Sequence, residues 1–184
     1  MKILGLSGSL RAESHNLHLL RAAAEGLPPG WELEVWDRLA EVPPFNEDDE
    51  DAAPEAVRAL NDAIRGADAV LVATPEYNAS LPGVLKNALD WVSRPYDATP
   101  LRGKPVAVVG ASTGLFGAVW AQAEGRKVLR TIGAHVLEDE LPVGLAQEAF
   151  DDEGRLRDPE LTTRLQDLVG ALVRESDTPV EQAA

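Results

Sequence analysis

The sequence contains no cysteine, so disulfides, thiolate nucleophiles and iron–sulfur clusters are excluded. It has only three histidines, and we expect no bound metal because they leave little material for a histidine-rich site. Basic residues are also scarce, since 17 Lys and Arg against 31 Asp and Glu give a formal net charge of −14. A chain this acidic repels phosphate backbones and anionic lipids, so we expect neither a nucleic-acid nor a membrane partner.

Long apolar runs are missing too. The first run, Ile3 to Leu6, is too short for the core of a signal peptide, and no run approaches a membrane span. The length of 184 residues suits a single domain with a full hydrophobic core, and an apolar share of 45% is ordinary for a globular protein. We therefore expect a soluble, cytoplasmic protein with one domain over residues 1–175 and a flexible tail at 176–184.

Hydrophobic periodicity switches repeatedly between strand and helix along the chain. Short apolar or alternating runs predict strands at residues 2–6, 31–36, 69–73, 106–110 and 135–137. Helical spacing of apolar residues predicts helices at residues 16–27, 54–64, 82–91, 117–132 and 159–174. The acidic segment at 46–51 is expected to be a solvated loop rather than a cation site.

This alternation predicts an α/β fold, a doubly wound parallel sheet of five strands with helices on both faces and strand order 2-1-3-4-5. In that order the connections reverse direction between the first and third strands, and ligands bind at the carboxyl ends of the strands there. The loops at residues 7–16, 74–83 and 110–117 should therefore form one site.

The first of these loops has the composition of a phosphate-binding segment. It reads GLSGSLRAESHN over residues 5–16 and places hydroxyls and Arg11 directly before a predicted helix. A helix start offers unpaired N–H groups to an anion, and an arginine can grip a phosphate through its planar fork. The spacing matches neither G-x-G-x-x-G nor G-K-[ST]. The alternative is a capping loop, with Arg11 solvated and His15 a polar bystander.

The other two loops can border a planar ligand. Residues 74–83 read TPEYNASLPG, in which prolines stiffen the backbone, Asn78 tolerates unusual dihedral angles and Tyr77 offers a flat face. Residues 110–118 read GASTGLFGA, whose Gly114 and Gly117 would let the backbone approach a ligand closely. The alternatives are a strand-to-helix turn with Tyr77 as a lid over the core, and an ordinary tight turn.

No group of side chains in the sequence predicts demanding chemistry without help. Ser112 lacks a nucleophile-elbow context such as G-x-S-x-G, and no base can be assigned to it. A cofactor that carries the chemistry is therefore expected, with no catalytic residue in the usual sense.

The segments GSLRAESHN, TPEYNASLPGVLKNALDW and GASTGLFGA resemble the NADPH-dependent FMN reductase family, in the same order and over about three quarters of the chain. The resemblance implies a flavodoxin-like fold with non-covalent FMN and with NADPH or NADH as electron donor. Its implied FMN-binding residues are Ser9, Arg11, Ser14, Asn16, Leu17, Pro75, Glu76, Tyr77, Asn78, Ser112, Thr113 and Gly114. One departure is Trp120, which stands where many relatives carry Arg.

The activity that the resemblance implies is transfer of hydride from the nicotinamide to FMN and then of electrons to a quinone, azo compound, chromate or free flavin. The alternatives are a flavodoxin-type electron carrier and a protein that keeps the fold without the cofactor. Family members are dimers or pairs of dimers. A homodimer is expected because the helix at 82–94 adds Ala88 and Trp91 to its main apolar stripe, and the alternative is that Trp91 packs within its own subunit. A homotetramer is the larger assembly that the resemblance allows.

Overall fold

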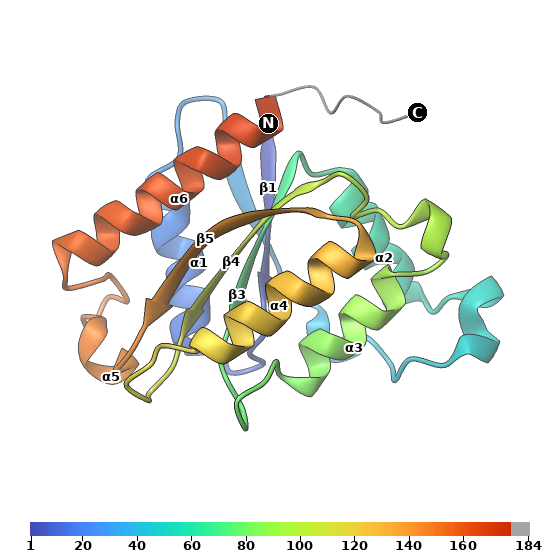
Figure 1. Cartoon of the computed structure of the whole chain (residues 1–184), viewed down its shortest axis with the longest axis horizontal. Helices are drawn as coiled ribbons and strands as arrows, with labels where there is room; N and C mark the ends of the chain where they lie inside the picture. The colour runs from blue at the N-terminus through green and yellow to red at the C-terminus, as the bar shows by residue number, and fades with distance from the viewer. Residues whose placement is uncertain (178–184) are drawn as a thin grey trace.

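The computed structural model describes residues 1–177 and shows one parallel sheet between two layers of helices (Figure 1). The strands are β1 (Lys2–Ser7), β2 (Glu32–Trp36), β3 (Ala69–Thr74), β4 (Pro105–Ala111) and β5 (His135–Val143). Their order is β2-β1-β3-β4-β5 and every pairing is parallel, which confirms the predicted topology. The carboxyl ends of β1, β3 and β4 consequently lie side by side at one edge of the sheet.

The helices divide between the two faces of the sheet (Figure 1). They are α1 (His15–Glu25), α2 (Glu55–Arg65), α3 (Gly83–Val92), α4 (Val119–Ile132), α5 (Ala146–Ala149) and α6 (Pro159–Asp177), with short 3₁₀ helices at Leu39–Glu41, Glu47–Ala52 and Tyr96–Ala98. Helices α1 and α6 cover one face, and α2, α3 and α4 cover the other. Right-handed crossover connections place helices in this way when the strand order reverses once.

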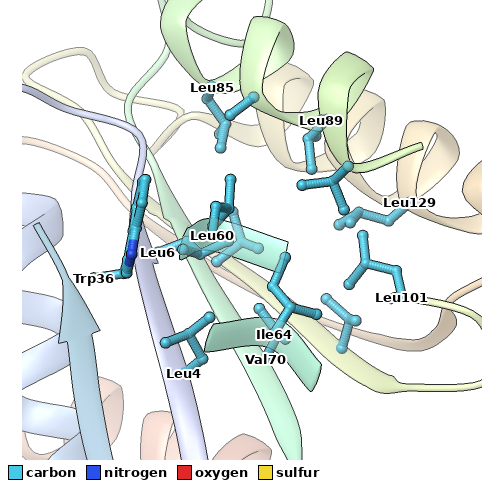
Figure 2. Close-up of a cluster of buried hydrophobic side chains, with 14 of the residues drawn as sticks. Leu4, Leu6, Trp36, Leu60, Ile64, Val70, Leu85, Leu89, Leu101 and Leu129 are labelled. Carbon is cyan, nitrogen blue, oxygen red and sulfur yellow. The ribbon is translucent and has the colours of Figure 1, made fainter. Parts of the chain in front are cut away.

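Strands β3 and β4 are buried along their whole length, as expected for continuous apolar runs covered on both faces. Figure 2 shows the core on the α2, α3 and α4 side, where strand residues such as Leu4 and Val70 face Leu60 and Ile64 of α2. Each fully buried side chain of this kind contributes about 1.5–3 kcal/mol to folding. The two packed faces hold the carboxyl edge of the sheet rigid beneath the predicted site.

Several predicted boundaries were wrong. β5 runs to Val143, well beyond the predicted end at 137, because a register shift against β4 interrupts its apolar pattern. The acidic segment forms a 3₁₀ helix capped by the Asn46 side chain rather than an irregular loop, although none of the residues in that helix is buried. α6 extends through Asp177, beyond the predicted helix end at 174, whereas the predicted domain over 1–175 stays a prediction and residues 178–184 of the predicted tail lie outside the described residues. No helix of the described part is long and apolar enough to cross a membrane.

The apolar side chains of α3 that suggested a subunit interface pack within their own chain. Trp91 is 2% exposed, and its indole N–H donates to the carbonyl of Pro43 at 2.8 Å. Asn87 hydrogen-bonds both Pro43 and Phe45, so the segment after β2 covers this side of the helix. The alternative in which Trp91 packs within its own subunit is thus confirmed, so α3 gives no evidence of an interface and the dimer stays a prediction.

Candidate functional site

The loops that follow β1, β3 and β4 meet at the carboxyl edge of the sheet and enclose a cleft of about 170 Å³. The cleft is lined by Ser9, Arg11, Ser14, His15, Asn16, Pro75, Glu76, Tyr77, Ala111, Ser112 and Thr113. Residues from all three predicted loops thus come together in one place. The prediction that these loops come together is confirmed, and ligand binding between them stays a prediction.

The first loop presents an unpaired cation and a helix start to the cleft. Ser14 is the N-cap of α1, and its hydroxyl accepts from the Asn16 backbone N–H. The Ser9 hydroxyl accepts from the backbone N–H of Arg11, which holds the loop closed on itself. Within the described part of the chain, the exposed Arg11 guanidinium has no carboxylate partner. A cation free of internal partners beside a helix N-terminus favours binding of an anion.

Asn16 ties the first loop to the third across the floor of the cleft. Its side chain donates to the carbonyl of Ala111 at 3.0 Å and accepts from the Ala111 backbone N–H at 2.9 Å. Asn16 is 2% exposed, so this pair of hydrogen bonds is shielded from water. The amide therefore completes the backbone hydrogen bonding at the end of β4 and fixes the start of α1 against the sheet.

The second loop is a rigid turn. Tyr77 and Ser80 hydrogen-bond each other through their backbones, and the two residues between them, Asn78 and Ala79, have φ angles of 54° and 59°. Positive φ at both central positions is the geometry of a type I′ turn, which confirms the expectation for Asn78. Glu124 of α4 anchors the turn, because its carboxylate accepts from the Ser80 hydroxyl at 2.6 Å.

That anchor is electrostatically favourable. The hydrogen bond from the Ser80 hydroxyl, followed by that from the Leu81 backbone N–H, lowers the pKa of Glu124 below its ordinary value. A carboxylate that accepts two hydrogen bonds is stabilised in its charged form. The turn is thus fixed to α4, which packs on the sheet. This contact holds Tyr77 at a defined position beside the cleft.

Glu76 and Tyr77, which adjoin in the sequence, play different parts. The Glu76 carboxylate accepts from the backbone N–H groups of Trp120 and Ala121, both at 3.0 Å, and so caps α4, which has no capping side chain of its own. Tyr77 is 51% exposed, so the alternative in which it is a lid over the core is wrong. The Tyr77 ring is available to a ligand, whereas the Glu76 carboxylate is already hydrogen-bonded to the start of α4.

The third loop is pinned to the segment that follows β5. Ser112 donates its backbone N–H to the carbonyl of Val143, and the backbone N–H of Leu145 donates to the carbonyl of Gly114, both at 3.0 Å. Gly117 has a φ angle of 60°, and a Cβ there would lie 2.5 Å from the backbone nitrogen of Val143. Gly117 therefore allows close packing against β5. The prediction that it lets the backbone approach a ligand was wrong.

Three predicted site residues do not line the cleft. Leu17 lines a neighbouring cavity of about 200 Å³ that also borders Ser9 and Arg11, Asn78 is a turn residue, and Gly114 supports the third loop through its carbonyl. Two lining residues, His15 and Ala111, were missed by the sequence analysis. His15 directly follows the N-cap of α1, and that position was the available signal.

Exposed apolar side chains lie on the third loop and at the start of α4. Leu115 and Phe116 of the third loop and Trp120 of α4 are all at least half exposed. The Phe116 and Trp120 rings meet edge to face with their centroids 5.3 Å apart. Because Trp120 donates its backbone N–H to Glu76, this aromatic pair is fixed directly beside the cleft.

A five-stranded parallel sheet of this order, with Arg11 and a helix start in one loop and a rigid aromatic-bearing loop beside it at the carboxyl edge, defines a flavodoxin-like protein. The sequence profile of the NADPH-dependent FMN reductase family matches residues 1–148. The chain belongs to this family.

Individual relatives agree with this assignment. The chain is 45% identical to an NAD(P)H-dependent FMN reductase of Pseudomonas aeruginosa over 174 residues, which cover 94% of this chain and 93% of that protein. It is 42% identical to a quinone reductase of Pseudomonas putida, with 82% of each chain covered.

A solved structure gives the same result in three dimensions. The flavoenzyme NAD(P)H:(acceptor) oxidoreductase of Paracoccus denitrificans superimposes with a TM-score of 0.83 at 36% identity. The superposition covers 96% of this chain and 97% of that one. The resemblance inferred from the sequence motifs, and the flavodoxin-like architecture that it implied, are confirmed.

Proposed function

We propose that the protein is an FMN-dependent oxidoreductase that takes hydride from NADH or NADPH and reduces a small acceptor such as a quinone. Family membership supports FMN as the cofactor and a reduced nicotinamide as the donor. The observation that carries the proposal is the cleft in which the three loops of the switch point converge on Arg11, whose guanidinium has no carboxylate partner within residues 1–177. A flavodoxin-like sheet binds its ligand at this position.

The residues of the first loop fit the phosphate of FMN. Arg11 supplies a positive charge that the described part of the protein does not neutralise, and Ser9 and Ser14 add hydroxyls at the same wall. The first turn of α1 adds N–H groups and the positive end of its dipole. Together these groups would hold a dianion by charge-assisted hydrogen bonds.

The second and third loops fit the ring system. We propose that Pro75, Glu76 and Tyr77 border one side of the isoalloxazine, with Asn78 shaping their turn, and that Ser112 and Thr113 border its edge, with Gly114 supporting their loop. The type I′ turn and its anchor on Glu124 support this assignment, because a stiff loop positions a planar ligand without further ordering cost. When bound, FMN supplies the hydride-accepting and electron-donating chemistry. The protein's part is to bind, orient and leave one ring face accessible, which requires no side-chain acid or base.

The proposal is tested by titrating flavin-free protein with FMN and then adding NADPH without oxygen, followed by a quinone. We expect FMN to bind, the flavin absorbance to bleach with NADPH and the absorbance to return with the quinone. FMN binding without bleaching would identify a flavodoxin-type electron carrier. Absence of FMN binding would identify a protein that keeps only the fold.

The phosphate assignment is tested at Arg11. Replacing Arg11 with Ala should weaken FMN binding by about 1.5–3 kcal/mol, or roughly 10- to 150-fold in Kd, the range for a hydrogen bond to a charged group. Arg21, an exposed arginine on α1 that does not line the cleft, is the matched control, and Arg21→Ala should bind FMN like the wild type. Equal affinity of the two variants would contradict the assignment.

We further propose a cytoplasmic homodimer, with a homotetramer as the alternative, and no nucleic-acid, membrane or metal partner. The nicotinamide donor is an intracellular metabolite, which supports the cytoplasm. The exposed Leu115, Phe116 and Trp120 support self-association, because a patch of this kind is a common interaction surface. We propose this surface as the subunit interface instead of α3, whose apolar residues are buried within the chain. Light scattering tests the assembly, since a particle mass near 19.7 kDa would contradict the dimer.

A further inference from the structure

His15 has no part in the mechanism above, yet its side chain lines the wall of the cleft formed by Ser9, Arg11 and Ser14. Its ring stacks on that of Phe150, with centroids 5.5 Å apart and an interplanar angle of 14°. The His15 Nδ1 atom is buried and has no hydrogen-bond partner within the described residues. A buried polar atom is normally paired, so no hydrogen bond from Nδ1 to another described residue holds this ring, and His15 stays available to an anion in the cleft that it lines.

The charges around His15 disfavour its cationic form in the ligand-free protein. Burial lowers the pKa of His15 below its ordinary value, and the nearby His18 and Arg11 lower it further. The His18 ring lies one turn along α1, 6.1 Å from that of His15, and approaches the Glu13 carboxylate at 3.7 Å. Across the cleft the Glu76 carboxylate is taken up by two backbone N–H groups of α4.

The segment after α5 also adds no free anion. Phe150 covers the ring of His15, and its carbonyl accepts from Arg157 at 3.0 Å. The neighbouring Asp151 is paired with Arg155 at 2.8 Å. Within the described residues, the neighbouring carboxylates thus face other groups, Glu13 the His18 ring, Glu76 the start of α4 and Asp151 the Arg155 guanidinium, so His15 has no counter-charge of its own. A bound phosphate would supply it.

We propose that His15 is a phosphate-binding residue that becomes an imidazolium when FMN binds, so that FMN binding takes up a proton. This inference rests on the proposed function, since it requires that the cleft hold the phosphate of FMN. An opposite charge at close range raises the pKa of an imidazole by about 1–3 units. Between its pKa in the free protein and its pKa in the complex, His15 is neutral before binding and cationic afterwards.

The sign of the proton exchange on FMN binding distinguishes protonation of His15 from a change in the protonation of the phosphate. A phosphate monoester has a second pKa of about 6, so near pH 7 most of it is already a dianion and it can release only about a tenth of a proton on binding. Protonation of His15 has the opposite sign. We expect a net uptake of protons on FMN binding near neutral pH, and an affinity contribution from His15 that is lost as pH rises through its pKa in the complex.

The experiment is isothermal titration of flavin-free protein with FMN in buffers of different ionisation enthalpy, which yields the protons exchanged as well as Kd. The first variant is His15→Phe, which keeps a ring against Phe150 but cannot be charged. It should bind FMN about tenfold or more weakly, with no proton uptake. The second is His15→Gln, which keeps a neutral hydrogen-bond donor and should also show no uptake. His135→Gln is the matched control, because His135 lies at the start of β5, away from the cleft, and it should behave like the wild type.

Riboflavin is the matched ligand, because it has the same ring without the phosphate, and its binding should take up no proton. Wild-type protein that binds FMN without net uptake, or His15→Phe protein that still takes up a proton, would overturn the role of His15 and leave the proposed function intact. Equal uptake with riboflavin would overturn it as well, because the ring rather than the phosphate would be responsible. Failure of the wild type to bind FMN at all would overturn the proposed function.

Discussion

Replacement of Asn16 with Ala should destabilise the protein strongly, because the side chain satisfies two backbone groups at the end of β4. The Asn16 amide donates to the Ala111 carbonyl at 3.0 Å and accepts from the Ala111 N–H at 2.9 Å. Both residues are 2% exposed. The variant leaves a buried N–H and a buried carbonyl without partners, each of which costs about 1–3 kcal/mol. Because the adjacent cleft can admit water to part of this space, we expect a total loss of about 2–4 kcal/mol in the free energy of unfolding.

The chain provides a matched control in Asn61 of α2. Asn61 is also buried, at 9% exposure, but its Oδ1 has no hydrogen-bond partner in the part of the chain that the structure describes. Asn61→Ala removes the same side-chain atoms as Asn16→Ala, but it breaks no hydrogen bond to the side-chain oxygen. It should therefore cost less than about 1 kcal/mol. The difference between the two variants isolates the hydrogen bonds of Asn16 from the loss of packing that both share.

The assay is urea unfolding of flavin-free protein, followed by far-UV circular dichroism, with thermal unfolding as a second measure. A loss of 1 kcal/mol corresponds to a fall in Tm of about 2–4 °C for a domain of this size. Equal destabilisation by Asn16→Ala and Asn61→Ala would refute the assigned role of the Asn16 hydrogen bonds. FMN affinity of folded Asn16→Ala protein then tells whether Asn16 also contacts the cofactor.

Substitutions at three further residues test the surroundings of the cleft. Glu76→Ala removes the cap of α4 and should lower the stability measured by thermal unfolding by about 1–2 kcal/mol. Glu76→Gln keeps an oxygen acceptor and should cost about half as much. An unchanged stability of the Glu76→Ala variant would disprove the capping role. Tyr77→Ala should change quinone kinetics while altering stability by no more than about 0.5 kcal/mol, since the side chain is half exposed. A large fall in Tm with unchanged turnover would show that Tyr77 serves the fold and not the acceptor site. Trp120→Arg should lower the particle mass measured by light scattering if the Phe116 and Trp120 surface joins subunits, and an unchanged mass would place Trp120 outside the interface.

The architecture and the location of the site could be predicted from the sequence. Continuous apolar runs such as Ala69–Thr74 report burial on both faces, and their alternation with helical periodicity leaves few ways to arrange a parallel sheet. The strand order then places the three loops together without further information. The family motifs lie in those same loops, so composition and topology indicated the same edge of the sheet. These features are local patterns, or follow from general rules of chain connection, and a sequence displays both.

The tertiary structure alone decided what each side chain in those loops does. Asn16 and Ala111 are far apart in the sequence, as are Glu76 and Trp120, and neither pairing has a signature in the residues around it. Trp91 has the same helical spacing whether it covers a second subunit or, as here, its own chain. Hydrophobic spacing reports how much of a segment is buried and not which partner buries it. Hydrogen-bond partners across loops depend on how the sheet and helices close around them, and that closure exists only in the folded chain.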